Sequence, residues 1–511
     1  MTTKHVLAAL ACVGATAGTA HAFCGFYVSG SGAKLGNDAT QVVLVRDGTR
    51  TVLSMQNDYN GPLDDFAMVV PVPVVLHEQD VKTLPKSVFE HVESLGAPRL
   101  VEYWEEDPCA FDKARGAGGM VGAVFGAAPD YDGAAPTTTA VKIEAKFDVA
   151  EYKILVLSAK DSTGLAEWLR QNHYNIPDGA EPLLRPYVEG GSKFFVAKVD
   201  PSKVALVAGH AALSPLRFHY DSDEFALPVR LGMANSNGTQ DLIVNIFSRK
   251  DRYEVANYPN VFAPTNLDVR GSVKARFGEF YAALFDRTIQ THPGAVVTEY
   301  AWTATRGYHC DPCPDLDVTP EDVMTLGGDV VGGGLDNDFV LTRLHARYGK
   351  GALADDLRFR VAKPIVGGRE ERDEKTGELE PGVHPSDDGQ SHFQARYAIR
   401  HWWTGPIACT NPRRGIWGGP PDGGQQVIAA QKLAFAPRGK LSLAGSVLAD
   451  VPDLKVWLPR QGAPAPPPSK FAQPPGGGAS GGVKAMSFGA GALGALGMIG
   501  LGALILRRRR A

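Results

Sequence analysis

The residues of this sequence with the clearest chemical potential are Cys310 and Cys313, which are separated by an Asp-Pro step. This C-x-x-C spacing suits a short-loop disulfide, a thiol redox pair or part of a zinc site. A redox pair normally begins a helix, which lowers the thiol pKa, but prolines flank Cys313 and no helical pattern follows. Zinc takes four ligands, and only His309 adds to the pair nearby. We therefore predict a structural disulfide, with the redox pair and the metal site as alternatives.

The remaining cysteines bear on the compartment in which the chain folds. Cys12 lies in the first apolar segment, and five cysteines follow that segment. In an oxidising compartment most cysteines are paired, and because five is odd at least one must be free, modified or intermolecular. Cys109 or Cys409 could instead complete a zinc site with residues 309–313. The disulfide candidates are Cys24, Cys109, Cys310, Cys313 and Cys409.

Other combinations that suggest chemistry are weaker. The sequence contains no H-E-x-x-H or P-loop motif. Residues 31–34 match S-x-x-K and residues 375–377 match K-T-G, but one stands among glycines and the other in a charged stretch, so we interpret both as chance. Residues 336–338 offer oxygen ligands for calcium without the EF-hand spacing, which favours a polar turn. His401-Trp402-Trp403 with Trp417 could form a sugar-binding surface, although such aromatic residues more often fill a core.

The charge balance argues against nucleic acid as a partner. The net charge of the 511-residue chain is −4, and it becomes −9 once Lys4 and the four arginines at 507–510 are set aside. A protein that tracks phosphates needs a basic stripe, and the sequence between the ends has none. Apolar residues make up 44% of the chain, enough for a sizeable core.

The N-terminus has the three parts of a secretory signal peptide. Lys4 precedes an apolar run over residues 6–17, and Ala20-His21-Ala22 is a small-x-small cleavage site. The apolar run is too short to span a bilayer. We predict a signal peptide over residues 1–22 and a mature chain that begins at Phe23.

The C-terminus predicts a membrane anchor. Residues 461–485 are rich in proline and glycine, as in a linker, and residues 486–506 carry no charge. An uncharged helix of this length spans the roughly 30 Å of a bilayer core. Basic residues stay on the cytoplasmic side, so the tail at 507–511 should lie inside and the bulk of the chain outside. The arginines concerned are Arg507, Arg508, Arg509 and Arg510.

This tail resembles the tripartite surface-sorting tails of myxobacteria, in which a linker, one helix and an arginine cluster are read by a membrane protease that removes them. The sequence departs from the cysteine-dependent form of these tails, because no cysteine follows Cys409. We predict a permanent single-pass anchor, with processing to the cell surface as the alternative.

Between the two ends, patterns typical of strands outnumber those typical of helices. An Asp-Gly step at residues 47–48 lies between two β-prone runs and predicts a hairpin. Helices are expected at residues 85–95, at 162–169 with a cap at Ser162 or Thr163, and from a cap at Ser272 to just before Pro293. The expected strands are residues 41–46, 49–56, 66–75 (at a sheet edge because of Pro71 and Pro73), 99–104, 153–157, 194–199, 226–233, 241–248, 296–302, 339–348, 357–361 and 393–403.

Residues 115–139 and 367–391 are expected to be loops. Strands follow one another without regular helices between them, so we predict an α+β fold with mainly antiparallel sheets and a few amphipathic helices. One extracytoplasmic domain should cover residues 23–460, with a division into two halves near residues 201–216 as an alternative.

Six short motifs together resemble a bacterial family. The family is catalogued as domain of unknown function 2330 (DUF2330), and the resemblance extends over about residues 23–403. It implies no activity, cofactor or catalytic residue, because none is established for that family. The motifs are Phe23-Cys24-Gly25-Phe26-Tyr27-Val28, Asn57-Asp58-Tyr59, Met68-Val69-Val70-Pro71-Val72-Pro73, Ala97-Pro98-Arg99-Leu100, Cys310-Asp311-Pro312-Cys313 and Leu341-Thr342-Arg343-Leu344.

These observations predict an exported, membrane-tethered envelope protein with a structural or binding role, no cofactor and no catalytic site. Its expected partners are the membrane, through the C-terminal helix, and a protein or a glycan. Two alternatives remain open. One is a thiol-redox or metal-dependent envelope enzyme centred on Cys310 and Cys313, and the other is a carbohydrate- or cell-wall-binding module.

Overall fold

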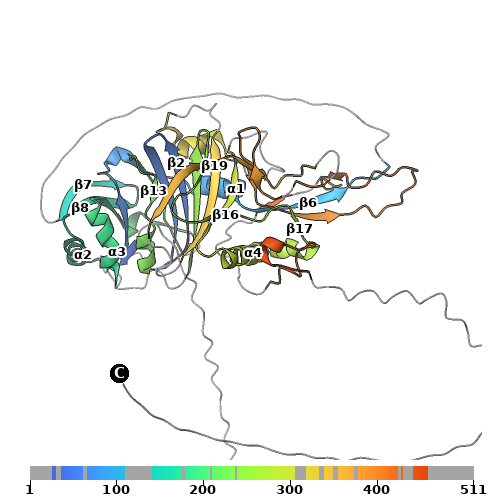
Figure 1. The fold of residues 1–511 in the computed structure, drawn as a ribbon. Coiled ribbons are helices and arrows are strands. Elements are labelled where there is room, and N and C mark those ends of the chain that lie inside the picture. The colour runs from blue at the N-terminus through green and yellow to red at the C-terminus, as the bar shows by residue number, and fades with distance from the viewer. Residues whose placement is uncertain are drawn as a thin grey trace, which may run out of the picture. The chain divides into compact units, whose positions relative to one another are not determined.

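The computed structural model divides the chain into two units, residues 1–459 and residues 460–511. All described residues lie in the first unit (Figure 1). Within them no helix is both long and apolar enough to cross a membrane. The predicted signal peptide, linker, membrane helix and basic tail lie outside the described residues. The described ranges are 26–29, 36–60, 66–109, 141–174, 176, 179–207, 210–235, 239–304, 318–332, 339–348, 355–372, 378–380, 382–423, 427–429 and 441–458.

A large mixed sheet forms the centre of this unit, with eleven strands among the described residues. Most strand pairings are antiparallel, as predicted, and β14 runs parallel to β2. The strands, in sheet order, are β22 (His384–Pro385), β21 (Ile365–Gly367), β23 (His392–Gln394), β18 (Val296–Thr303), β19 (Val340–Tyr348), β14 (Gln240–Ser248), β2 (Gly36–Asp47), β3 (Arg50–Asn60), β12 (Leu216–Asp221) and β5 (Val81–Thr83), while β16 (Asn260–Phe262) pairs with β18 outside this path.

The predicted hairpin at residues 47–48 is confirmed. Asp47 pairs with Arg50, and Gly48 has the positive φ of 57° that a tight turn needs. Val42 and Leu44 pack into one hydrophobic cluster, whereas Val43 and Val45 pack into another. Both faces of β2 are therefore buried, which explains the continuous apolar run in its sequence.

A second sheet packs against one face of the central sheet. Its strands, in order, are β1 (Phe26–Ser29), β4 (Phe66–Val72), β9 (Lys193–Val199), β8 (Tyr152–Ala159) and β7 (Val141–Val149). Val70, Ile154 and Phe195 face the cluster shared with the central sheet. The other face is covered by α2 (Ser162–Gln171) and α3 (Ala180–Glu189), which lie beside β7 and β8 in Figure 1.

Two details of this sheet differ from prediction. Strand β4 is not an edge strand, because it lies between β1 and β9. Among the described residues β1 pairs with residues 66–69 of β4, and on the other side of β4 Pro71 pairs with Phe194 of β9. The cap of α2 is Asp161, which accepts a bond from the Gly164 N–H, whereas the predicted cap Ser162 donates to Glu181.

Helices α1 and α4 pack on the central sheet through separate hydrophobic clusters. Helix α1 (Ser87–Gly96) confirms the helix expected at residues 85–95 and buries Phe89 and Val92 in a cluster with residues of β18 and β19. Helix α4 (Phe277–Thr291) packs against β18 and β24. The predicted cap at Ser272 is wrong, because a 3₁₀ turn over Gly271–Arg276 comes first and α4 begins at Phe277.

A third sheet extends from one end of the domain, where β6 and its loops lie in Figure 1. Strand β6 (Arg99–Glu105) pairs in parallel with β24 (Arg396–His401), which in turn pairs with β17 (Leu267–Asp268). On its other side β6 pairs with β25 (Trp417–Gly418) and β26 (Val427–Ala429). The single strand predicted over residues 393–403 is wrong, because β23 belongs to the central sheet and β24 to this one.

The remaining elements include further differences from prediction. The strand predicted at 226–233 is only β13 (Ala226–Leu227), which joins β20 (Leu357–Ala362) and β15 (Arg252–Val255), and a 3₁₀ helix follows at Arg230–Asn235. Strands β10 (Ala205–Val207) and β11 (His210–Ala212) pair within residues 201–216, near which the alternative division into two halves was placed. The predicted loop at 367–391 contains β22. The other short helices are α5 (Pro320–Val323), a π turn at Met324–Gly328, and 3₁₀ turns at Glu78–Asp80, Pro201–Lys203 and Pro452–Leu454.

Candidate functional site

Two of the five predicted disulfide candidates are joined. Cys109, just after β6, and Cys409, in the loop after β24, form a disulfide with their Cα atoms 5.7 Å apart and a sequence separation of 300. The Cys409 N–H also donates to the Cys109 sulfur at 3.3 Å, and the Arg413 N–H donates to the Pro108 carbonyl at 2.9 Å. These bonds tie residues 402–416 to the end of β6. We call β6, β24, β25 and the loops at 106–109 and 402–416 the arm.

Glu105 organises the loop of the arm. Its side chain, which is fully buried, accepts hydrogen bonds from the Trp403 N–H at 2.9 Å, the Gly415 N–H at 2.8 Å and Arg414 Nε at 2.8 Å. Burial would raise the pKa of Glu105, but these donors hold that pKa below its ordinary value. One carboxylate thus fastens both ends of the loop to β6. Sequence analysis missed Glu105, because a lone acidic residue at a strand end has no distinguishing signal.

The loop carries an exposed aromatic surface. Trp402 is 57% exposed, and its ring meets Trp417 edge to face with centroids 4.8 Å apart. The Arg414 guanidinium lies 5.7 Å from the centre of the Trp402 ring, and Ile407 is 42% exposed in the same loop. We call Trp402, Ile407, Arg414 and Trp417 the Trp402 surface. The sequence favoured a core position for these tryptophans, but the structure places Trp402 at the surface.

His401 and its neighbours hold the strand beneath this surface. The His401 ring stacks on Trp104 with centroids 4.6 Å apart, and His401 Nε2 lies 2.9 Å from Glu102 Oε1. Glu102 also pairs with Lys274. Although burial opposes its ionisation, bonds from Lys274 and His401 lower the pKa of Glu102. The predicted residue His401 is therefore held by Trp104 and Glu102 of strand β6, and Glu102 is in turn paired with Lys274 in the turn before α4.

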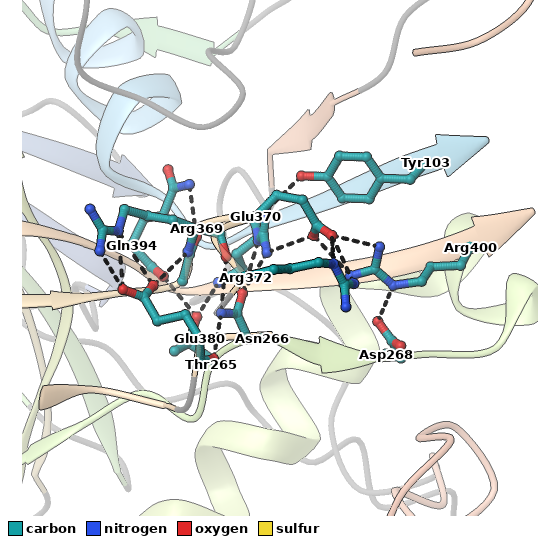
Figure 2. A network of polar contacts seen from close by, with 12 residues as sticks. Tyr103, Thr265, Asn266, Asp268, Arg369, Glu370, Arg372, Glu380, Gln394 and Arg400 are labelled. Carbon is teal, nitrogen blue, oxygen red and sulfur yellow. Dashed lines mark hydrogen bonds and ion pairs between the residues drawn. The ribbon is translucent and has the colours of Figure 1, made fainter. Parts of the chain in front are cut away.

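The root of the arm is a second network of charges, and Figure 2 shows Glu370 between Arg372 and Arg400. Glu370 accepts from Arg400 at 2.8 Å and 2.9 Å and from Arg396 at 3.1 Å. Arg400 also donates to Asp268 at 2.9 Å, and its guanidinium lies 4.9 Å from the centre of the Trp417 ring. Glu370 and Asp268 therefore hold the Arg400 guanidinium against the ring of Trp417, which belongs to the Trp402 surface.

A separate buried network lies where α1 and α4 meet the central sheet. Glu299 is fully buried and bonds Arg343 Nε, His345 Nδ1 and the Tyr281 hydroxyl, each at 2.7 Å. Arg343 continues to Glu93 at 2.6 Å. Burial opposes ionisation of Glu299, but His345 and Arg343 hold its pKa at about 2.

This buried network contains residue types that are common in active sites, but its central side chains are not accessible to solvent. Glu299 and Arg343 are 0% exposed, and the other nitrogen of His345 is occupied by Asp241 at 3.0 Å. These ionisable side chains are paired with one another. We interpret the network as the tie that holds α1 and α4 on the sheet.

The other predicted site residues are not placed. Cys24, His309, Cys310 and Cys313 lie outside the described residues, as do the four arginines at 507–510 and the sequence matches at 31–34, 336–338 and 375–377. Within the described part of the chain, no three His, Cys, Asp or Glu side chains are grouped to hold a metal ion. The redox and zinc hypotheses for Cys310 and Cys313 stay predictions.

Comparison with known families assigns the main part of the chain. A family model described as "Uncharacterized protein conserved in bacteria (DUF2330)" matches residues 18–360. The chain belongs to this family. The match in this DUF2330 protein ends within β20, so β24 and the Trp402 surface lie beyond it, and the match is shorter than the predicted 23–403. No curated protein and no solved structure matches the chain.

Proposed function

We propose that this DUF2330 protein is exported to the cell envelope, is held at a membrane by its C-terminal helix, and has a binding role there. The observation that supports this most is the disulfide between Cys109 and Cys409. Disulfides between residues so distant in sequence persist in oxidising compartments, whereas cytosolic thiols are kept reduced. The bond also joins Cys109, within the part matched by the family model, to Cys409, which lies beyond it. The arm would therefore gain this covalent link only in an oxidising compartment outside the cytoplasm.

The two ends of the sequence support the same location. Residues 1–22 have the charge, apolar run and small-residue site of a signal peptide. Residues 486–506 are uncharged, and four arginines follow them. A chain with these ends would place residues 23–460 outside the cytoplasm and only its last residues inside.

A binding role fits the described side chains better than catalysis does. The clusters around Glu299 and Glu370 satisfy their charges internally. The Trp402 surface, by contrast, leaves Trp402 more than half exposed on a loop tied by a disulfide and by Glu105. Functional residues on a loop that a rigid framework positions are typical of binding proteins.

The location is tested by expressing the full chain in a bacterium and separating soluble and membrane fractions. We expect a chain cleaved after Ala22, resistant to carbonate extraction, with Cys109 and Cys409 inaccessible to maleimide until reduced. A matched variant truncated after residue 485 should be exported but released from the membrane. A full chain recovered from the cytosol with both cysteines reactive would refute the proposal.

A further inference from the structure

We propose that the Trp402 surface binds a neutral polysaccharide by stacking a pyranose ring on the indole of Trp402, which rests on the proposed envelope location. The CH groups of a pyranose ring form an apolar face, while its hydroxyls lie around the edge. Such a ligand needs one exposed aromatic face with hydrogen-bond donors beside it. Trp402, 57% exposed, supplies the face, and Arg414, 43% exposed along its side chain, supplies the donors.

The side chains of the Trp402 surface are held in place by their neighbours. This favours binding of a sugar, which makes few contacts through each pyranose ring. The ring of Trp402 is set against Trp417 at an interplanar angle of 73°. The backbone next to it is held by the bond from the Trp403 N–H to buried Glu105 and by the Cys109–Cys409 disulfide. Because these groups are already ordered, binding loses little conformational entropy.

The size of the apolar surface argues for a sugar over a protein partner. A stable protein interface buries about 800 Å² on each side and has several apolar residues at its centre. In the described part of the arm, the large hydrophobic side chains classed as exposed are Trp402 and Ile407. That is enough for one or two sugar rings and little for a protein.

The charges around the surface argue for a neutral glycan over an acidic one. Arg414 is paired with Glu105, and Arg400 is paired with both Glu370 and Asp268. Arg414 and Arg400, the cations whose guanidinium groups lie over the two tryptophan rings, therefore each have a carboxylate partner, which lowers the attraction of this surface for an anionic polymer.

The test is native gel electrophoresis of the full chain, purified in detergent, through gels that contain hydroxyethyl cellulose, galactomannan, soluble glycol chitin or, as an anionic comparison, alginate. We expect at least one neutral polymer to retard the chain. The Trp402→Ala variant should weaken that binding at least tenfold, and Trp402→Phe should retain part of it because the aromatic face remains. The matched control is Trp457→Ala, because Trp457 is 58% exposed and lies outside the arm.

Thermal unfolding of each variant tests whether the fold is intact, and we expect unchanged midpoints because Trp402 and Trp457 are both more than half exposed. Absence of retardation by every neutral polymer, equal losses in the Trp402 and Trp457 variants, or binding to alginate alone would overturn the proposal. Self-association that the Trp402→Ala variant abolishes would show a protein interface instead. Correct membrane location with no glycan binding would overturn this inference and leave the proposed location intact.

Discussion

Replacing Arg343 with methionine is expected to be the most damaging single change in the buried network. Arg343 is 0% exposed and donates to Glu299 at 2.7 Å and to Glu93 at 2.6 Å and 3.2 Å. Methionine fills much of the same volume without a charge, so both carboxylates lose their shared partner. Breaking a buried ion pair on one side costs about 3–5 kcal/mol, because the remaining charge stays in a medium that solvates it poorly.

The pKa of Glu299 gives a second route to the same magnitude. A carboxyl whose pKa falls from 4.5 in the unfolded chain to about 2 in the folded chain contributes roughly 3 kcal/mol of stability at neutral pH. Because the folded pKa is depressed, this contribution is present above about pH 4.5 and is lost as the pH falls toward 2. In Arg343→Met the ionised Glu299 contributes less stability, so acid removes less of it. The difference in unfolding free energy between the wild type and Arg343→Met should therefore narrow as the pH falls from about 4.5 toward 2.

The assay is urea unfolding of the full chain at pH 7 and at pH 3, followed by tryptophan fluorescence. The matched control is Arg360→Met, because Arg360 also makes two bonds to one carboxylate, Glu254, at 2.9 Å and 2.7 Å, but is 59% exposed. Exposed pairs contribute up to about 1 kcal/mol, so this control should differ little from the wild type. If Arg343→Met does not accumulate, Glu299→Gln tests the acid dependence, which it should weaken. An Arg343→Met loss no larger than that of the control would refute the reasoning.

Three further expectations follow from the same contacts. Burial lowers the pKa of His345, but Glu299 and Asp241 raise it above 6.5 overall. The stability that His345 contributes is therefore complete below pH 6.5 and is lost as the pH rises through the folded pKa. His345→Gln should remove this loss of stability between pH 6 and pH 9, measured as urea midpoints, and a variant that loses as much stability as the wild type would contradict the reasoning. Glu105→Gln should cost about 1–3 kcal/mol and speed hydrogen exchange at its amide partners in the loop, whereas unchanged exchange would argue against its role. Replacing Cys109 and Cys409 by serine should cost about 2–4 kcal/mol, and reductant should bring the wild type to the same urea midpoint; insensitivity to reductant would count against the bond.

Elements with strong local patterns were predictable. The hairpin of β2 and β3 follows from an Asp-Gly turn between two β-prone runs, and α1 follows from apolar residues on one helical face. Both patterns involve neighbours in sequence, so no knowledge of distant contacts is needed. The α+β class with mostly antiparallel pairing follows from the same kind of evidence.

Elements whose form depends on distant partners were not predictable. Helix α3 contains Pro186, which argues against a helix, yet it is retained because Leu184 and Tyr187 are buried in the cluster that α3 shares with α2 and β9. The change of sheet at Ala395, between β23 and β24, has no local signal, because no glycine or proline interrupts residues 393–403 until after Trp403 and the segment reads as a single strand. Tertiary packing outweighs local preference in both cases.

The sequence alone was sufficient for the family, for the fold class and for the hypothesis that the chain is exported, because each depends on short motifs or on stretches of uniform polarity. It could name Cys109 and Cys409 as candidates but could not pair them, since their sequence separation is 300. The role of Glu105 and the exposure of Trp402 depend on which strands lie side by side, and that is decided by how the hydrophobic clusters of the whole domain pack together.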